Sequence, residues 1–553
     1  MGLRHPVYAV VLCALVAVLV YIPTLKYQLV WDDLGIVVQN QSSPLQSFAR
    51  SFWYGGGAGV LGDDPYYRPL VNFSLGVDEL IAGHRAWYFH MVNVLLHAVL
   101  VCLACVVVWQ LFGSVQAVLV AGMVGAVHPF AADSVAYVSG RTDLLAGAGL
   151  LVALLGLLRL QKRHDWAAVA MIWAGFAVGV LSKETAVMFA VVAGVWVLGP
   201  GLRRARRTDW IALAGVCFLF VAYVAARYAV LGNAVGTGVG SSGGAWLVLS
   251  LDNFGRLLLR SVWPWGQGVF VWSTAGSGRL SWFVVVSFLY MALPLVLRRM
   301  RQSREALLFW FWGLVMLLPF AGFAGFGPVG RLLYVPGIGF VLLALYAGRE
   351  GTRGHRGARS GAVVITLAYC ALLALIALPQ RMRVWQDGNT LFSRMIQEAP
   401  LYPAGHFNRA HDLRRRADVD GAIAEYRRAI ELDPSMALAY SNLGALLQSR
   451  GELAEAESLY LRTIGLRPNY ALAWNNLAIV RYKRGDGAGA VHAFRRAIQL
   501  KPDDAGAVYN LGRVYQQAGI ADSAASMFRR AYRLDPGNPQ IRASYEQTHG
   551  QGP

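Results

Sequence analysis

The chain is poor in charge and in cysteine, and both shortages restrict what it can be. Only 15% of its 553 residues are charged, whereas 56% are hydrophobic. That is too apolar for one soluble core and is typical of a membrane protein. The five cysteines all lie in apolar segments, so no disulfide framework is indicated. Cys102 and Cys105 have CxxC spacing, but no second pair or histidine cluster completes a metal site, and small packed thiols are the better interpretation.

Signatures of several enzyme classes are missing as well. The chain has no βαβ dinucleotide pattern and no HExxH or GxSxG motif. The glycine run from Gly232 to Gly244 lacks the GxxxxGK[ST] pattern of a phosphate loop and is interpreted as a connector. A soluble nucleotide-sugar donor and the usual membrane hydrolases are therefore disfavoured.

Apolar runs of membrane-crossing length fill the first 380 residues. The first run follows Arg4 without a small-residue cleavage site, which predicts an uncleaved signal anchor. Length and hydropathy predict about eleven transmembrane helices. They are residues 7–25, 88–112, 115–131, 140–160, 166–182, 185–199, 209–231, 280–297, 305–321, 331–348 and 361–379.

The net charge of +19 is concentrated between these runs. Arginine clusters within 159–163, 203–207, 298–304 and 349–359 all fall on one side if the N-terminus is cytoplasmic, which is the positive-inside pattern. Orientation therefore explains the basic charge, and no nucleic-acid partner is expected. The same parity places the loop after the first run and the C-terminal domain on the opposite side. The Ala-, Gly-, Val- and Arg-rich composition favours a bacterial inner membrane, with that domain in the periplasm.

A period of 34 residues begins near residue 400. Prolines at 400, 434, 468, 502 and 536 keep this step, and Gly451, Gly485 and Gly519 mark turns, with Ala417 in the equivalent place of the first unit. A 34-residue helix–turn–helix unit is a tetratricopeptide repeat (TPR). The sequence thus predicts an all-α protein with a membrane helical bundle over 1–380, a connector over 381–402 and a TPR α-solenoid over 403–548. Four repeats and a capping helix are expected in the last part.

Polar side chains gather at one end of the predicted membrane helices. Asp32 and Asp33 follow the first run, where adjacent carboxylates are costly to bury. His90, Asn93 and His97 share one helix face, which must point into the bundle or a wet cavity. The remaining candidates are Arg68, His128, Asp133, Arg141, Asp143, Lys183, Glu184, Arg331 and Tyr334. Each alone also fits a helix cap, a snorkelling end or an internal ion pair such as Lys183 with Glu184, but their convergence on one side favours a site.

These residues suit transfer from a membrane-anchored phosphorylated donor. Arg141, Lys183 and Arg331 are the cations that could bind a lipid phosphate and stabilise it as it departs. A carboxylate nearby could take a proton from an acceptor hydroxyl as it attacks the sugar carbon of the donor.

Eight short motifs in order give the chain a family resemblance. They are Trp31-Asp32-Asp33 with Asn40, Tyr67-Arg68-Pro69-Leu70, Phe89-His90, Asn93 to His97, His128-Pro129, Gly140-Arg141-Thr142-Asp143, Ser182-Lys183-Glu184 and Arg331 to Pro336. The chain resembles the transmembrane-and-TPR O-mannosyltransferases, a branch of the GT-C glycosyltransferases, over nearly its whole length. One departure is Asp133, where eukaryotic members usually carry Glu.

The resemblance implies a polyprenyl-phosphate-linked sugar donor and an inverting transfer to a hydroxyl, often Ser or Thr of a protein. In GT-C enzymes an acidic residue of the first outside loop serves as base or positions a metal. By position Asp32 is the first choice for the base and Asp33 the second. Metal use differs among these enzymes, so the resemblance assigns no cofactor.

An asparagine recurs in each repeat, at Asn408, Asn442, Asn476 and Asn510. These residues resemble the inner-face asparagines of O-linked N-acetylglucosamine transferase, which hold an extended peptide. An amide can pair with any main chain, so the ladder could bind a polypeptide acceptor. The equal alternative is that the asparagines tie one repeat to the next.

Two functional hypotheses remain open at this point. The first is a membrane glycosyltransferase that uses a lipid-linked sugar, with exported repeats that recruit a protein acceptor or partner. The second is a non-enzymatic membrane scaffold whose repeats organise envelope or secretory complexes.

Overall fold

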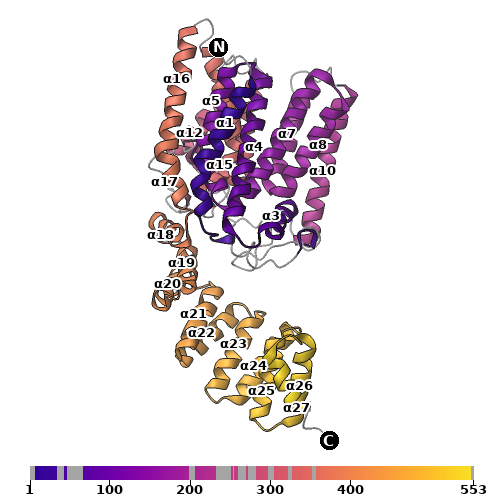
Figure 1. The fold of residues 1–553 in the computed structure, drawn as a ribbon, viewed down its shortest axis with the longest axis vertical. Coiled ribbons are helices and arrows are strands. Elements are labelled where there is room, and N and C mark those ends of the chain that lie inside the picture. The colour runs from indigo at the N-terminus through magenta and orange to yellow at the C-terminus, as the bar shows by residue number, and fades with distance from the viewer. Residues whose placement is uncertain are drawn as a thin grey trace. The chain divides into compact units, whose positions relative to one another are not determined.

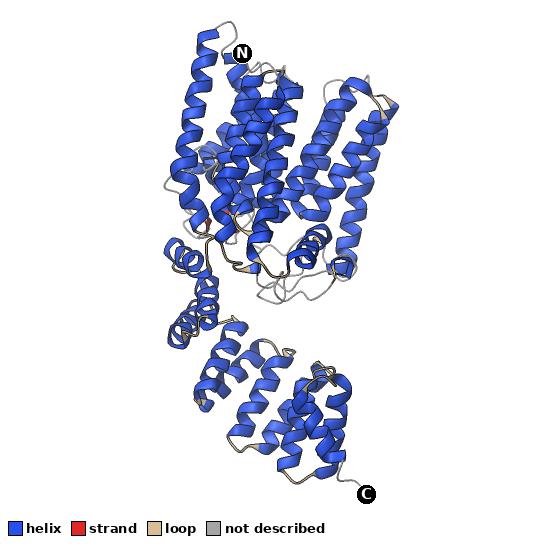
Figure 2. Cartoon of the chain, viewed as in Figure 1, coloured by secondary structure: helices blue, strands red, loops and turns tan. Residues whose placement is uncertain are grey.

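The computed structural model describes residues 6–33, 43–46, 67–198, 206–231, 251–252, 254–259, 270–271, 282–296, 304–321, 327–351 and 356–549. Asn40 and the run from Gly232 to Gly244 lie outside these ranges. The described chain divides by its contacts into two compact units, Met1–Glu398 and Ala399–Pro553. Nearly all of it is helical (Figure 2), which confirms the predicted all-α class. The exception among the described residues is a two-residue antiparallel ladder of β1 (Phe270–Val271) with β2 (Gly327–Pro328).

The first unit is a bundle of apolar helices (Figure 1). Its elements in order are α1 (Pro6–Tyr21), η1 (Ile22–Lys26), α3 (Pro69–Ala82), α4 (Ala86–Phe112), α5 (Val115–Val127), α6 (Phe130–Val135), η3 (Val138–Gly140), α7 (Arg141–Arg163), α8 (Trp166–Ser182), η4 (Glu184–Met188), α9 (Phe189–Leu198), α10 (Arg207–Leu231), α12 (Trp282–Val296), α14 (Arg304–Ala321), α15 (Val329–Gly351), α16 (Arg356–Leu372), η6 (Leu373–Ala377), α17 (Leu378–Arg383) and α18 (Gly388–Glu398).

Six stretches in the described part of this bundle are long and apolar enough to cross a membrane. They are Pro6–Lys26, Ala86–Phe112, Val138–Arg163, Arg207–Val230, Arg331–Arg349 and Ser360–Arg383. Five shorter apolar helices coincide with the other predicted crossings: Val115–Val127, Trp166–Ser182, Glu184–Val197, Val284–Pro294 and Ala306–Leu317. The number of eleven crossings stays a prediction.

Small residues allow α7 and α8 to approach closely. A Cβ added at Gly149 would lie 2.6 Å from the carbonyl oxygen of Gly175, and one at Gly156 would lie 2.9 Å from that of Ala168. Lipid offers no hydrophobic drive for helix association, so close backbone packing at small residues is a main source of stability. This contact fixes the start of α7 beside the end of α8, where several candidate residues lie.

The helix predicted over residues 361–379 extends beyond its predicted end. A π turn over Leu373–Ala377 connects α16 to α17, and the helix continues to Arg383. Pro379, in the first turn of α17, has no N–H to donate and disfavours a regular bond to the preceding turn, which accounts for the π geometry. The predicted connector 381–402 thus holds the end of α17 and all of α18.

The second unit is a row of antiparallel helix pairs. The pairs are α19 (Pro403–Arg415) with α20 (Val419–Leu432), α21 (Ala437–Arg450) with α22 (Leu453–Leu466), α23 (Ala471–Lys483) with α24 (Gly487–Leu500), and α25 (Ala505–Gln517) with α26 (Ala521–Leu534), followed by α27 (Pro539–His549). Ala422, Tyr426, Ala456, Tyr460 and their equivalents form one continuous buried core. The predicted TPR solenoid is therefore confirmed, and α27 occupies the place predicted for the capping helix.

The turns of the repeats require a left-handed backbone. Gly451, Gly485 and Gly519 have φ of 84°, 86° and 73°, and Ala417 has φ of 62° at the same place in the first repeat. Glycine adopts this conformation without a Cβ clash, whereas alanine does so at a cost.

Candidate active site

The candidate residues converge at one end of the bundle, called the outer end below. This is the end that holds Asp32 and Asp33, and α3 packs there against α4, α7 and α8 (Figure 1). Four groups of side-chain contacts form this end, and each group involves residues at or near the ends of helices.

The first group surrounds the two adjacent aspartates. Trp31 has φ of 53°, a left-handed value that is strained for a bulky side chain and is most often found at functional sites. Asp33 is fully buried, and its Oδ1 accepts bonds from the backbone N (2.8 Å) and the hydroxyl (2.6 Å) of Ser139. Its Oδ2 accepts longer bonds from the backbone N atoms of Val30 (3.3 Å) and Val138 (3.4 Å). Asp33 therefore ties the chain after α1 to the segment before α7.

Asp32 has different surroundings. It is half-buried, and its Oδ2 accepts a bond from the hydroxyl of Tyr137 at 2.9 Å. The Tyr137 ring is stacked with Trp385 at 4.7 Å and with Trp31 at 6.1 Å between centroids. Burial raises the pKa of the Asp33 carboxyl to about 7, with a smaller contribution from the charge of Asp32. The two carboxylates thus differ in access, and only Asp32 is partly open.

The second group joins three candidates around Asp143. Its carboxylate is fully buried and pairs with Lys183 and, at 3.0 Å, with Nε of Arg331. Arg331 also donates to the hydroxyl of Thr142 (2.9 Å) and the carbonyl of Ser139 (3.2 Å), and its guanidinium carbon lies 5.1 Å from the centroid of the Tyr137 ring. Tyr137 is thus in contact with both the Asp32 carboxylate and the Arg331 cation.

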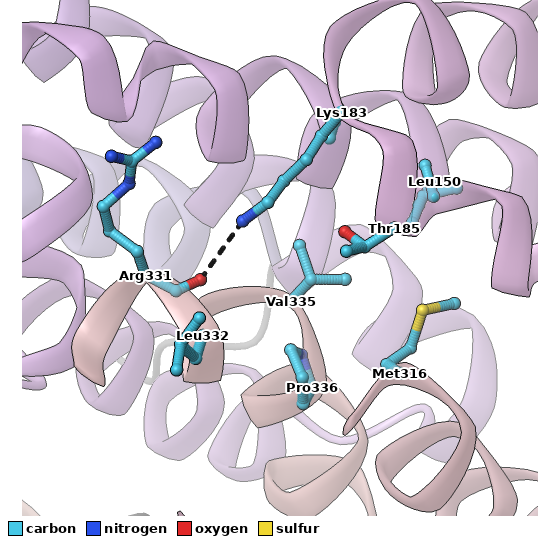
Figure 3. A pocket seen from close by; sticks show the side chains of 10 residues that line it. Leu150, Lys183, Thr185, Met316, Arg331, Leu332, Val335 and Pro336 are labelled. Carbon is cyan, nitrogen blue, oxygen red and sulfur yellow. Dashed lines mark hydrogen bonds between the residues drawn. The ribbon is translucent and has the colours of Figure 1, made fainter. Parts of the chain in front are cut away.

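Lys183 and Arg331 line a small cavity of about 10 Å³, room for about one water molecule, at the ends of α8 and α15. In Figure 3 the ammonium of Lys183 points to the Arg331 carbonyl oxygen, at 3.5 Å, with Thr185 beside it and apolar side chains below. One carboxylate shared by two cations leaves a local excess of positive charge, which is suited to an anion.

The third group pairs Arg68 with Glu184. The guanidinium donates from Nε (3.1 Å) and Nη2 (2.8 Å) to the two carboxylate oxygens. Lys183 therefore pairs with Asp143, and its sequence neighbour Glu184 binds another residue, in contrast to the Lys183–Glu184 pair considered from the sequence.

The fourth group holds Asp133 in an ion pair. Arg381 donates to both of its oxygens (2.8 and 2.6 Å), and the indole of Trp385 donates at 3.0 Å. This fixes α17 against α6. Neither Arg381 nor Trp385 was among the predicted site residues. The expected topology puts Arg381 on the side without the arginine clusters, and this is the signal in the sequence that could have pointed to it.

Arg141 is poorly suited to the phosphate contact predicted for it. Its side chain has no exposed surface, and its guanidinium binds Asp78 (2.5 Å), Asn93 (2.9 Å), Ser74 (3.1 Å) and the carbonyl of Phe89 (3.1 Å). A phosphate would have to displace these bonds. The arrangement instead connects α3, α4 and α7 into one rigid end.

The three candidates on one face of α4 all point into the bundle, as predicted. His90, Asn93 and His97 are buried. Asn93 donates to the carbonyls of Tyr137 (3.1 Å) and Val138 (3.2 Å), so it orients η3 as well as Arg141. The Nδ1 atom of His97 lies 2.7 Å from the hydroxyl of Tyr334.

His97, His128 and Tyr334 border a second, mainly apolar cavity of about 130 Å³. Side chains of α4, α5 and α15 line it, among them Val101, Val108 and Val341. His97, Tyr334 and the C-cap residue His128 supply the polar part of the lining, and the rest of it is mainly aliphatic.

The inner helices of the repeats carry the four asparagines. Asn408 is buried and the other three are half-buried. Asn442 lies next to the Tyr426 hydroxyl of the preceding repeat, and Asn476 next to that of Tyr460. These contacts support the alternative in which the asparagines connect repeats, while half-exposed amides still leave room for a ligand.

No group of three or more His, Cys, Asp or Glu side chains suited to a metal ion occurs within the described ranges. The residues at the outer end are arranged as ion pairs of acids with Lys and Arg instead.

Comparisons with known proteins match both units. Residues 63–226 fit the family described as dolichyl-phosphate-mannose-protein mannosyltransferase, a stretch that includes Arg68, Asp133, Asp143 and Lys183. Residues 410–451, 436–467 and 475–539 fit tetratricopeptide repeat families. A protein O-mannosyl-transferase, Tmtc2 of Drosophila melanogaster, is 34% identical over 228 residues, which are 39% of this chain and 24% of that protein. The chain is similar to the protein O-mannosyl-transferases that carry TPR repeats.

This similarity matches the resemblance drawn from the motifs, and it extends over much of the chain in one relative. The human protein O-mannosyl-transferase TMTC1 is 23% identical over 514 residues, covering 80% of this chain and 57% of that protein. Tmtc1 of Drosophila melanogaster is 31% identical over 193 residues, 34% of this chain and 22% of that protein. The matched regions thus span between about a fifth and three fifths of these O-mannosyl-transferases. A solved structure, that of MamA protein, covers 27% of this chain and 81% of its own, at 24% identity and a TM-score of 0.26.

Proposed function

We propose that this protein transfers mannose from a polyprenyl-phosphate-linked donor to a Ser or Thr hydroxyl of a polypeptide, at the outer side of a bacterial inner membrane. The observation that carries the proposal is the group of ion pairs at the outer end, where Lys183 and Arg331 share Asp143 within reach of the Tyr137–Asp32 pair. The match to the mannosyltransferase family over 63–226 supports the sugar and the acceptor class.

The proposed step is an inverting displacement. The acceptor oxygen forms a bond to the anomeric carbon of mannose, and the bond from that carbon to the phosphate oxygen breaks. Asp32 takes the hydroxyl proton, and the polyprenyl phosphate leaves with the electron pair. Lys183 and Arg331 stabilise the negative charge that develops on the leaving oxygen.

The surroundings of the two cavities match the two parts of such a donor. Lys183 and Arg331 offer positive charge for a phosphate at the small cavity between them, which would have to widen to admit it. The apolar one beside Tyr334 runs along membrane helices and suits an isoprenoid chain. The half-exposed asparagines of the repeats suit an acceptor peptide in an extended conformation. The solenoid would bind the backbone of this peptide close to the Ser or Thr that accepts the sugar.

A transfer assay tests this function. Purified protein in lipid nanodiscs is given a mannosyl-phosphoryl-polyprenol and a Ser/Thr-rich peptide, and mannose on the peptide is measured by mass spectrometry. Asp32→Asn is expected to lower the rate by at least about 100-fold, the usual contribution of a general base. The matched control is Asp165→Asn, because Asp165 pairs with Arg159 near the opposite end of α7 and an asparagine there still caps α8. Wild-type rates in Asp32→Asn would exclude Asp32 as the base, and no consumption of donor by the wild type would favour the scaffold.

The acceptor proposal has its own test. Replacing Asn476 and Asn510 by Ala should raise the KM for a long acceptor and leave the KM for a short peptide unchanged. An equal effect on both peptides would contradict recruitment by the repeats.

A further inference from the structure

One buried arginine at the outer end has no role in the groups described above. Arg227 lies one turn before the end of α10, at the same end of that helix as Leu231. An arginine there usually extends to the membrane surface. The Arg227 side chain does the opposite: only 7% of the residue is exposed.

Its guanidinium is incompletely bonded. The buried Nη1 atom has no hydrogen-bond partner in the part of the chain that the structure describes. A guanidinium stays charged at any physiological pH, and an uncompensated buried charge is strongly unfavourable. Such a group indicates either strain or a missing anionic ligand.

The charges around Arg227 identify that ligand as an anion. Glu184, Arg227 and Arg68 are the charged neighbours of the Tyr223 hydroxyl, on the turn of α10 before Arg227. Glu184 is already held by both donors of Arg68, and Lys183 precedes it in the chain. Arg331 in turn is close enough to Arg68 for their charges to interact.

The outer cation group therefore consists of four residues: Arg68, Lys183, Arg227 and Arg331. Among the described residues, Asp143 pairs with Lys183 and Arg331, and Glu184 pairs with Arg68, so that neither carboxylate is bonded to Arg227.

We propose that Arg227 binds the phosphate of the prenyl-phosphate donor and of the departing prenyl phosphate, as the member of this cation group that has no carboxylate partner among the described residues. The inference rests on the proposed function for the identity of the ligand. The phosphodiester of the donor carries one negative charge and the released monoester nearly two. A cation at this position thus stabilises the leaving group more than the donor, and Arg227 should affect kcat more than the KM for donor.

Binding of a short prenyl phosphate tests the proposal directly. Farnesyl phosphate is titrated into the full-length protein in nanodiscs, with farnesol as the uncharged probe. We expect Arg227→Gln to weaken farnesyl phosphate binding by about tenfold or more, the value of one charge-assisted bond, and to leave farnesol binding unchanged. Arg227→Lys keeps the charge but loses the fork of donors, and a smaller loss is expected.

The matched control is Arg207→Gln. It makes the same change of charge on the same helix, at an exposed position at the other end. Farnesyl phosphate affinity of Arg227→Gln within twofold of the wild type would overturn the proposal. Competition by inorganic phosphate at the same concentration as farnesyl phosphate would also overturn it, because the ligand would then be free phosphate. If Arg227→Gln does not fold, Arg227→Lys decides: wild-type affinity in that variant contradicts a directional phosphate contact.

Sugar transfer measured on the same samples separates this inference from the proposed function. A wild type that binds farnesyl phosphate through Arg227 but transfers no mannose refutes the function and supports the phosphate site. A wild type that transfers mannose, with unchanged kcat in Arg227→Gln, refutes the phosphate site and supports the function.

Discussion

Asp33→Asn separates the anchoring role of Asp33 from the chemical role proposed for Asp32. The substitution removes one acceptor oxygen from a carboxylate that receives bonds from Ser139, Val30 and Val138. It also removes a charge from a site without solvent access, where burial raises the pKa to about 7. These two effects on the free energy of unfolding have opposite signs and partly cancel.

The pH dependence of stability separates the effect of the Asp33 charge from the effect of its hydrogen bonds. A carboxyl with a raised pKa binds its proton more tightly when the protein is folded, so its ionisation destabilises the fold. Stability is highest below the ordinary pKa of 3.8, falls as pH rises through the window up to about 7, and is constant above it. Each pH unit in this window is worth about 1.4 kcal/mol. Between pH 5 and pH 8 the wild type should therefore lose about 3 kcal/mol relative to Asp33→Asn, whatever the hydrogen-bond loss.

The assay is the apparent Tm of the full-length protein in nanodiscs at pH 5 and pH 8, at a fixed scan rate. The gap between Asp33→Asn and wild type should shift in favour of the variant as pH rises. Mannose transfer is measured on the same samples, and Asp33→Asn should keep a substantial rate while Asp32→Asn loses it. Parallel Tm changes in the two proteins between pH 5 and 8 would refute the titration. Full loss of transfer in a folded Asp33→Asn, with activity kept in Asp32→Asn, would reverse the assignment of the base.

Three further predictions concern stability. Ala417→Gly should stabilise the repeats by about 0.5–1 kcal/mol in a calorimetric scan, because it relieves a left-handed alanine and gives up part of that gain as unfolded-chain entropy. The 2.7 Å bond to Glu425 raises the pKa of His406, so its stabilisation is full below about pH 6.5 and is lost as pH rises through the raised value; Glu425→Gln should remove this dependence of Tm. Asp133→Asn should destabilise the membrane unit by about 3–5 kcal/mol, because the buried Arg381 cation would lose this carboxylate. Adding Arg381→Met should recover part of the loss of Tm.

The repeats were the most predictable part of the chain. Their order follows from local chemistry: prolines and turn glycines every 34 residues, and alanines and aromatics where two helices cross. Even the exception was visible, since Ala417 is out of pattern in the sequence and strained in the structure. The positions of the apolar helices followed in the same way from hydropathy, and each predicted crossing coincides with an apolar helix.

The pairing of charges could not be predicted from the sequence. Spacing showed that Lys183 and Asp143 lie at helix ends on one side, but the choice of Asp143 over the adjacent Glu184 depends on the close approach of α7 and α8 at Gly149 and Gly175. Arg141 looked like a free cation because its partner Asp78 lies in α3, a short helix outside the apolar runs. Tyr137 had no distinguishing pattern in the sequence, although its hydroxyl donates to Asp32 and its ring contacts Arg331.

The electrostatics of the outer end explain why these cations are shared and not simply paired. A lysine or arginine buried at that depth without a counter-charge is strongly unfavourable, and a one-to-one ion pair would have no charge left for a ligand. One carboxylate between two cations satisfies both demands: Asp143 orients Lys183 and Arg331, and the surplus charge remains. Tyr137 then donates to Asp32 and lies beside Arg331, so the Asp32 carboxylate and the Arg331 cation contact the same side chain. An anion bound by Lys183 and Arg331 would therefore lie one side chain away from Asp32, the residue proposed as the base.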